Sequence, residues 1–231
     1  MKKFLLLFVS MLCMSMSAQN LQLHYDFRGT CNSNANPDGN YLTATFEMFK
    51  ADKLGNTFMF IDADFNLRRG NIGLMYAEIA REFTLGTLPI AAHIEFNGGI
   101  ANFGTIDNAY LVGVALPFNI KKFGFNTYLV YRLNNYHVVS NDVQWTLVWN
   151  SNFFNDRLTF NGHFDLWTEN KDRVTGRGGK KVAIQTEPQL WYNVIPGRFS
   201  VGTEIEMTSN FYLYNDGAFT CYPTLALKYS F

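Results

Sequence analysis

The run Phe219-Thr220-Cys221-Tyr222-Pro223-Thr224-Leu225-Ala226-Leu227-Lys228-Tyr229-Ser230-Phe231 decides the fold class. Apolar and aromatic side chains alternate along it with polar or small ones, as they do in a β-strand with one apolar face. Tyr229 and Phe231 fall on that face at its end. A frayed end in water would gain little from them, whereas aromatic rings prefer the membrane interface. The run is therefore predicted to be a strand in the wall of a transmembrane β-barrel.

Residues 1–18 are predicted to be a cleaved signal peptide. Met1-Lys2-Lys3 is a short basic start, residues 4–14 are apolar, and residues 15–18 (Ser-Met-Ser-Ala) fit a cleavage site before Gln19. The apolar run is too short for an ordinary spanning helix, and an uncleaved anchor is the alternative. Residues 19–231 are expected to form one exported domain, the barrel itself.

The composition argues against an ordinary soluble domain. Aromatic residues and charged residues each make up 16% of the chain, whereas charged residues reach roughly a quarter of an average soluble domain. After residue 18, no apolar stretch has the length of a spanning helix, so a membrane-embedded chain must cross with strands. The formal net charge is zero and no basic block occurs, which argues against nucleic acid as a partner.

Alternation along the chain predicts twelve strands in an up-and-down order. An even number places both chain ends on the periplasmic side of a bacterial barrel. Residues 72–85 also fit a helix, and Pro188 and Pro223 fall inside predicted strands, where bulges are expected to accommodate them. The predicted strands are 21–28, 41–50, 57–67, 72–85, 89–98, 109–118, 123–133, 142–151, 157–168, 181–193, 197–208 and 218–231.

The predicted connections alternate in length, as they do in outer-membrane barrels. Short ones at 51–56, 86–88, 119–122, 152–156 and 194–197 are expected in the periplasm, and longer ones at 29–40, 99–108, 134–141, 169–180 and 209–217 outside, with 68–71 a short exception. An aromatic girdle is expected at the periplasmic strand ends, formed by Phe118, Phe123, Trp149, Tyr192, Phe199, Tyr229 and Phe231.

The predicted fold is thus all-β, a closed antiparallel up-and-down transmembrane β-barrel of about 12 strands in the bacterial outer membrane. Outer-membrane lipid is the expected surrounding, and the barrel-assembly machinery is the expected partner for insertion. A soluble lipocalin-like barrel, with its apolar face turned inward, is the alternative.

If the apolar faces meet lipid, the opposite faces line the lumen, and they are polar, net acidic and partly aromatic. Such a lumen can hydrogen-bond hydroxyls and stack planar rings, so it suits a small neutral solute better than a phosphate. The alternative is a narrow barrel that its own paired charges fill. The candidate solute-binding residues are His24, Asp26, Arg28, Phe58, Phe60, Asp62, Asp64, His93, Glu95, Tyr128, Arg132, His163, Asp165, Trp167, Glu187, Trp191, Glu204 and Glu206.

Residues 21–27, Leu-Gln-Leu-His-Tyr-Asp-Phe, resemble the opening strand of the nucleoside-specific outer-membrane channel family (Tsx-like). Residues 76–83, Tyr-Ala-Glu-Ile-Ala-Arg-Glu-Phe, look like the acidic, Arg-bearing strand of that family. The terminal Phe231 resembles the closing-strand signature of bacterial outer-membrane proteins. The resemblance implies a small barrel that passes nucleosides passively.

Catalysis is not expected. His24 and Asp26, His93 and Glu95, and His163 and Asp165 form His-carboxylate pairs on single strand faces, but Gly-x-Ser-x-Gly, His-Glu-x-x-His and P-loop motifs do not occur in the sequence. No cofactor or metal is expected, because the His residues lie on separate strands without ligand spacing. A barrel enzyme acting on lipid and a structural or adhesive barrel with functional loops remain the alternatives.

Cys31 and Cys221 are expected to be neighbours, because the first strand of a closed meander pairs with the last. Export to an oxidising compartment would permit a disulfide between them. Two unpaired thiols are the alternative.

Overall fold

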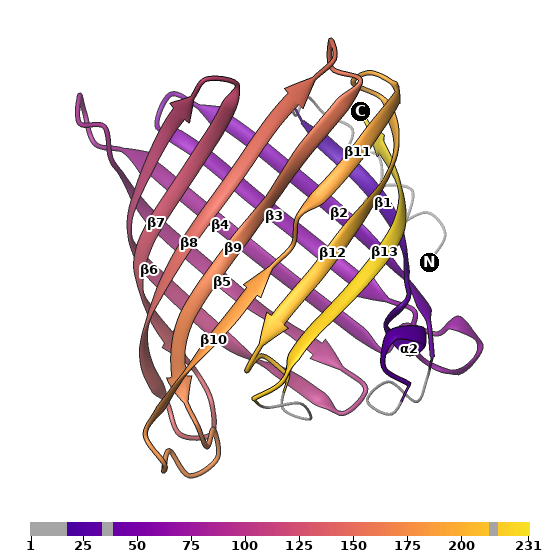
Figure 1. Ribbon diagram of the computed structural model, residues 1–231. Coiled ribbons are helices and arrows are strands. Elements are labelled where there is room, and N and C mark those ends of the chain that lie inside the picture. The colour runs from indigo at the N-terminus through magenta and orange to yellow at the C-terminus, as the bar shows by residue number, and fades with distance from the viewer. Residues whose placement is uncertain (1–17, 34–38, 213–216) are drawn as a thin grey trace, which may run out of the picture.

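The computed structural model describes residues 18–33, 39–212 and 217–231, which form a closed barrel of antiparallel strands (Figure 1). β10 and β11 together occupy one place in the wall between β9 and β12, so twelve strand positions close the barrel. The strands are β1 (Gln19–Asp26), β2 (Tyr41–Asp52), β3 (Gly55–Asp64), β4 (Leu74–Thr84), β5 (Ala91–Ala101), β6 (Gly104–Ile120), β7 (Phe123–Asn134), β8 (Ser140–Phe153), β9 (Leu158–Asn170), β10 (Lys180–Thr186), β11 (Gln189–Ile195), β12 (Phe199–Ser209) and β13 (Phe219–Ser230).

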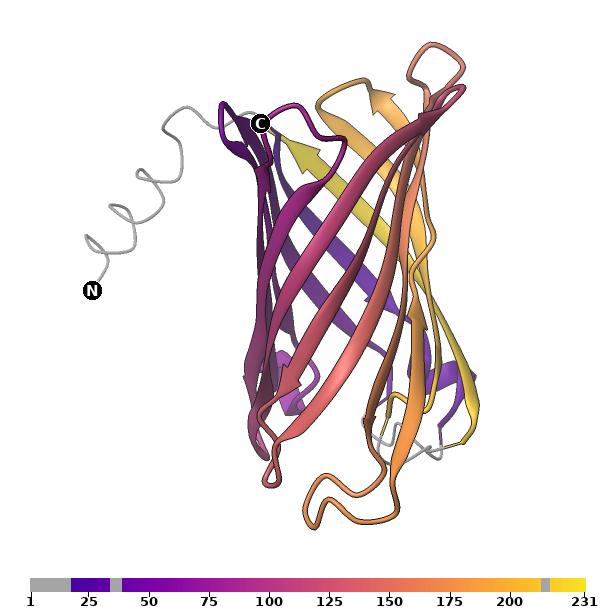
Figure 2. The same cartoon turned by 90° about the vertical axis from the view of Figure 1, so that its left-hand side faces the viewer.

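Pairing of β1 with β13 closes the barrel, in a register that runs from Asn20 opposite Ser230 to Asp26 opposite Thr224. The wall is continuous and its strands are strongly tilted when seen from the side (Figure 2). The predicted fold class is therefore confirmed, and residues 74–84 form a strand rather than a helix. The predicted signal peptide lies outside the described residues, apart from Ala18.

Alternating burial shows which face meets lipid. Along β1, Leu21, Leu23 and Tyr25 are exposed, whereas Gln22 and His24 are buried. The apolar side chains therefore point outward, as a bilayer requires, and the lipocalin-like alternative is wrong. Among the described residues, no helix combines the length and the apolar character needed to cross a membrane.

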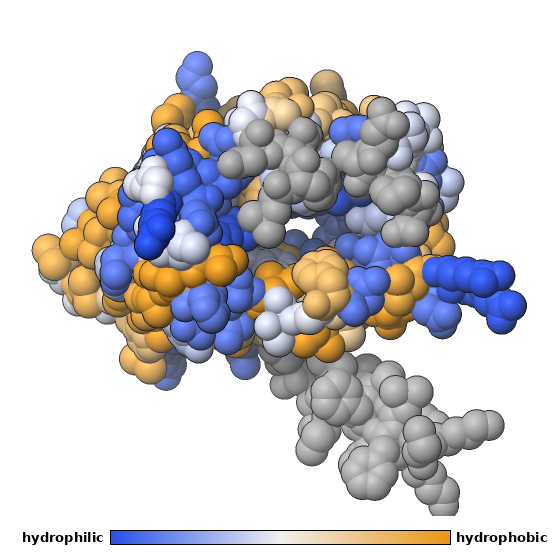
Figure 3. Space-filling view, turned by 90° about the horizontal axis from the view of Figure 1, so that it is seen from below, coloured by the Kyte–Doolittle hydropathy of each residue, from blue (hydrophilic) through white to orange (hydrophobic). Residues whose placement is uncertain are grey.

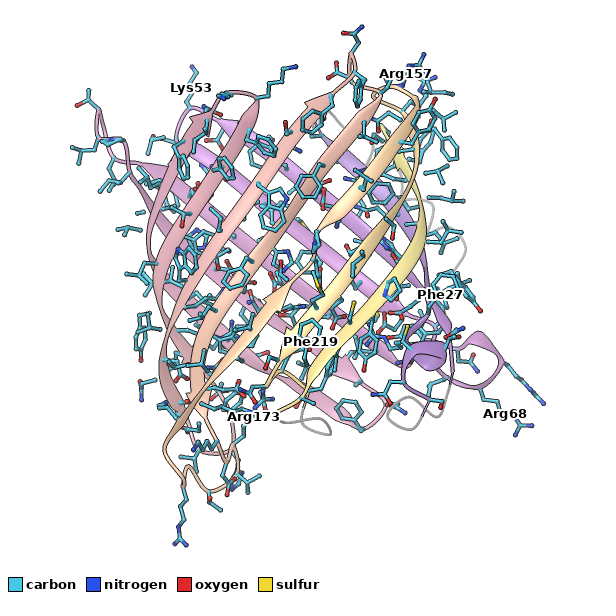
Figure 4. All side chains as sticks on the ribbon, viewed as in Figure 1. Phe27, Lys53, Arg68, Arg157, Arg173 and Phe219 are labelled. Carbon is cyan, nitrogen blue, oxygen red and sulfur yellow. The ribbon has the colours of Figure 1, made fainter. Side chains whose placement is uncertain are left out.

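Aromatic rings gather on the outer face near one end of β6, β7 and β8. Phe118 stacks on Phe125 with ring centroids 5.1 Å apart, and Phe123 contacts both Phe125 and Phe153. Lys53 and Arg157 mark this end, and Arg68 and Arg173 mark the opposite one (Figure 4). The C-terminus lies at the same end of the barrel as Lys53 and Arg157, which is the end predicted to be periplasmic.

The outer connections differ from the prediction at three places. Residues 99–108 do not form a loop, because β5 continues to Ala101 and β6 begins at Gly104, so the hairpin turn holds only Asn102 and Phe103. The first strand ends at Asp26, and a short helix, α2 (Arg28–Cys31), follows at the outer mouth. The connection predicted as the short exception, 68–71, runs instead from 65 to 73 and holds a second helical turn, η1 (Arg68–Gly70).

The tenth strand position is broken at Glu187 and Pro188, but not by the expected bulge. Thr186 pairs with Met207 and Gln189 with Glu204, so the register is the same on both sides of the break. Pro188 cannot donate to the ladder, but its carbonyl accepts the amide hydrogen of Ile205 at 3.1 Å. Opposite the break lies Gly162 (φ 154°), where a Cβ would meet the Glu187 carbonyl oxygen at 2.4 Å.

Pro223 is likewise accommodated without a register shift, since Gly202 pairs with Ala226 and Ile205 with Pro223. Its carbonyl accepts from the Phe27 amide at 3.2 Å. The Thr224 hydroxyl accepts the Glu204 amide hydrogen at 3.1 Å, which compensates for the disturbed ladder. Bulges were thus wrongly predicted here.

Cys31 and Cys221 are free, exposed thiols, so the expected disulfide is not formed. The prediction correctly placed the first strand and its loop beside the last strand. It did not consider the direction in which the two cysteine side chains point. Cys221 lies on the outward face of β13, whereas Cys31 lies in α2 at the mouth.

Candidate functional site

The lumen collects the predicted site residues from every side of the barrel. All of them except Arg28 and Glu187 lie on the inner faces of their strands, as the cross-strand pairs show. Glu187 lies in the break between β10 and β11, where its carboxylate accepts from the Gln185 amide at 2.7 Å. Asp62, for example, faces Thr45 on one side and Tyr76 on the other. Arg28 is not on a strand, but α2 directs its side chain into the outer mouth. That any of these residues binds a solute stays a prediction.

Other lumen residues were missed on the even-numbered strands. Glu47 and Glu78 lie on either side of Phe60, and Glu82 lies beside His93. Gln144 is buried on the inner face of β8. The same alternation could have found them, because each is two residues from another inward position.

Arg28 is enclosed at the outer mouth by Asp26, Glu206, Tyr212, Tyr41 and Tyr222, a group called here the Arg28 cage. Its guanidinium lies 2.7 Å from an Asp26 oxygen and 3.1 Å from a Glu206 oxygen, and it donates to the Tyr212 hydroxyl at 3.0 Å. The rings of Tyr41 and Tyr222 lie 5.3 and 5.1 Å from it. The cage ties β1, β12, β13 and the loop before β13 together at this end.

His93 lies between two carboxylates in the wall formed by β4 and β5. Its Nδ1 is 3.3 Å from Glu82 and its Nε2 is 3.0 Å from Glu95. The Tyr128 ring stacks on the imidazole with a centroid distance of 4.1 Å. Asn126 donates to Glu82 at 2.6 Å. Both ring nitrogens are therefore engaged.

Trp191 is the centre of a third group, on the wall formed by β11, β13 and β1. The Lys228 ammonium lies 3.8 Å from the centre of the indole ring, and His24 meets that ring edge-on at 6.0 Å. The Trp191 Nε1 donates to Gln189 at 3.0 Å. A ring with its nitrogen bound and its face covered by a cation is fixed in place.

Glu169 forms ion pairs with two basic side chains at the outer mouth. Its buried carboxylate accepts from Arg173 at 2.8 Å, lies 3.3 Å from Lys181 and accepts from the Tyr136 hydroxyl at 2.7 Å. Tyr136 lies in the loop between β7 and β8, where burial and the nearby Glu169 charge raise its pKa. This network fixes the outer ends of β7, β9 and β10.

Part of the lumen is open to solvent. The side chains of His163 and Asp165 are 30% and 18% exposed, and that of Glu204 is 19% exposed. Seen from the loop end, the molecule is hollowed at its centre (Figure 3). Asp62 and Asp64 accept hydrogen bonds from Thr45 and Thr43 and belong to no ion pair among the described residues. Internal pairing therefore fills the lumen only in part.

No group of three or more His, Cys, Asp or Glu side chains in the described ranges is arranged to hold a metal ion.

Residues 18–231 match the family described as "Domain of unknown function (DUF5020)". The chain belongs to the DUF5020 family. No curated protein matches this DUF5020 chain. Two solved porins share its fold. NanC porin is 13% identical with a TM-score of 0.59, over 92% of this chain and 99% of that one. KdgM porin is 8% identical with a TM-score of 0.52, over 92% and 99%.

The closed barrel, its apolar exterior and the porin fold place this DUF5020 chain in the bacterial outer membrane. Neither the family description nor the two porin titles mention nucleosides. Nucleoside specificity, which the resemblance of the first strand implied, therefore stays a prediction.

Proposed function

We propose that this barrel is a passive channel for small polar solutes. The observation that carries the proposal is the partly exposed polar inner face of a closed barrel, with His163, Asp165 and Glu204 in contact with solvent. A barrel that served only as a rigid support could be filled with apolar side chains, because placing ionisable groups inside a protein costs free energy.

Solutes without net charge fit this lumen best. Unpaired carboxylates such as Asp62 and Asp64 would repel phosphates, since like charges interact strongly in a confined pore. Phe60 and Tyr76 lie together on the inner wall, with ring centroids 6.1 Å apart, and offer faces to a planar ring. Nucleosides, which the first strand suggested, meet both conditions.

Catalysis is not part of the proposal. A general base needs a free ring nitrogen, whereas both nitrogens of His93 lie against carboxylates. The His163 Nε2 lies 3.7 Å from Asp165, beyond hydrogen-bond distance. Two solved porins have the same fold, and this similarity of fold supports a channel.

Liposome swelling tests the proposal directly. Liposomes that contain the purified barrel should swell in uncharged solutes of nucleoside size or smaller, and swelling in the corresponding phosphates should be slower. Liposomes without protein, and liposomes with heat-unfolded protein, provide the background. Swelling at the background rate in every solute would exclude a channel.

A further inference from the structure

Arg132 on β7 is a lumen cation without a carboxylate partner in the described part of the chain. Its Nε donates to Asn134 Oδ1 at 2.8 Å and its Nη1 donates to Gln144 Oε1, so both bonds go to neutral amides. Asp142 lies directly opposite on β8 but is held by Lys180 at 2.7 Å and by Asn134 at 2.8 Å. The Arg132 charge is therefore positioned but not neutralised.

Gln144 links this cation to an anion. Its Oε1 accepts from Arg132, and its Nε2 lies 3.4 Å from Asp165 Oδ1 on β9. The same Asp165 oxygen accepts from the Thr146 hydroxyl. Asp165 is 18% exposed, and its Oδ2 faces His163 at 3.7 Å. One amide thus holds a guanidinium and a carboxylate apart, and both can meet a solute in the lumen.

Trp167 completes the arrangement. The Arg132 guanidinium carbon lies 5.1 Å from the centre of its ring. The indole nitrogen donates to Glu169 at 3.2 Å, and Glu169 is itself neutralised by Arg173 and Lys181. The ring is consequently fixed from behind, and it fixes the guanidinium in turn.

We propose that Arg132 and Asp165 form a binding site for zwitterionic solutes of the α-amino acid class. The guanidinium binds the solute carboxylate, for which a planar fork of donors is well matched. Asp165 binds the ammonium group, and the buried Trp167 ring holds the guanidinium in place. The proposal rests on the channel function and narrows it to solutes that carry both charges while having no net charge.

Four small probes separate the two charges. Serine carries both, lactate only the carboxylate, ethanolamine only the ammonium and glycerol neither. Uptake into liposomes at low solute concentration, where binding decides flux, should favour serine over glycerol in the wild type. Arg132→Gln should remove that preference, with a loss of about tenfold, the scale of one hydrogen bond between charged groups. Arg132→Lys should restore part of it, since the charge remains and the fork is lost.

Asp165→Asn tests the other end while keeping an acceptor for Thr146. It should lower uptake of serine and ethanolamine and leave glycerol unchanged. Lys228→Gln is the matched control, because it removes a lumen cation that also lies over a Trp ring, on the β13 wall. Heat-modifiable migration on gels shows whether each variant is folded.

Two outcomes contradict different claims. If glycerol and serine enter at equal rates in the wild type, and Arg132→Gln changes neither, the zwitterion site is wrong and the channel stands. If no probe enters faster than into protein-free liposomes, the channel itself is wrong.

Discussion

Leu21 of the first strand lies directly opposite Tyr229 of the last, and both side chains point outward. Each is among the exposed apolar residues of the barrel, so the seam is as apolar on the outside as the rest of the wall. Since β1 and β13 are joined by an unbroken antiparallel register, the barrel has no free edge there.

A closed seam predicts resistance to detergent. The folded protein should fractionate with the outer membrane and migrate differently on gels before and after boiling, because the intact ladder resists sodium dodecyl sulfate until it is heated. Recovery of the protein in the soluble periplasmic fraction, with one band in both samples, would contradict a closed barrel.

Asp62 and Asp64 are expected to govern ion preference. Replacing both with Asn removes two unpaired lumen charges, so the preference of the channel for cations over anions should fall, as the reversal potential in a salt gradient reports. Asp107→Asn is the control, because Asp107 is an exposed residue at the loop end of β6. An unchanged reversal potential would mean that these aspartates do not line the conducting path.

Arg28→Gln should destabilise the outer mouth. It leaves Asp26 and Glu206 without their cation, and removing one partner of a buried pair costs about 3–5 kcal/mol, less here because the group is partly exposed. Urea unfolding in detergent micelles measures the loss. Arg157→Gln is the control, since Arg157 lies in an exposed turn and donates to one backbone carbonyl. Equal stability of both variants would argue against the cage.

The two thiols should react differently. Cys31 is at the mouth, so a membrane-impermeant maleimide should label it on intact cells. Cys221 points outward from β13 and should react only with apolar reagents or after transfer to mild detergent. Mass mapping of unreduced protein should find both free, and a Cys31–Cys221 peptide would overturn the pairing state described above.

Asp172, in the loop between β9 and β10, should titrate below the usual range. Hydrogen bonds from the Thr175 hydroxyl and from the amides of Thr175 and Val174 lower its pKa. A lowered pKa stabilises the loop above the unfolded-state pKa, and this is lost as the pH falls through the folded-state value. Thr175→Val should raise the pKa of Asp172, as carboxyl NMR reports. An unchanged titration would mean that the hydroxyl bond is not formed in solution.

The sequence predicted the barrel well because membrane strands obey a two-residue period throughout. Leu21 and Leu23 against Gln22 and His24 already separate the two faces, and the structure keeps that separation. The predicted strand of residues 123–133 is observed at Phe123–Asn134. The lumen list followed from the same rule.

Other features depend on three-dimensional context that alternation does not contain. Residues 99–108 are rich in small and polar residues, a composition that fits a loop and a solvent-exposed strand pair equally well. The prediction therefore missed the hairpin at Asn102. Ion-pair partners are equally hidden. Arg132 could have paired with Asp142 opposite, but Lys180 and Asn134 hold that carboxylate instead.

At the break formed by Glu187 and Pro188, the barrel should accept substitutions but not the insertion or deletion of a single residue. Because the register is unchanged across the break, deleting one of the two residues would exchange the faces of β11. Trp191 and Asn193 would then enter lipid, and Leu190 and Tyr192 would enter the pore. Natural variants of this segment should therefore differ by substitution, or by insertions and deletions of even length.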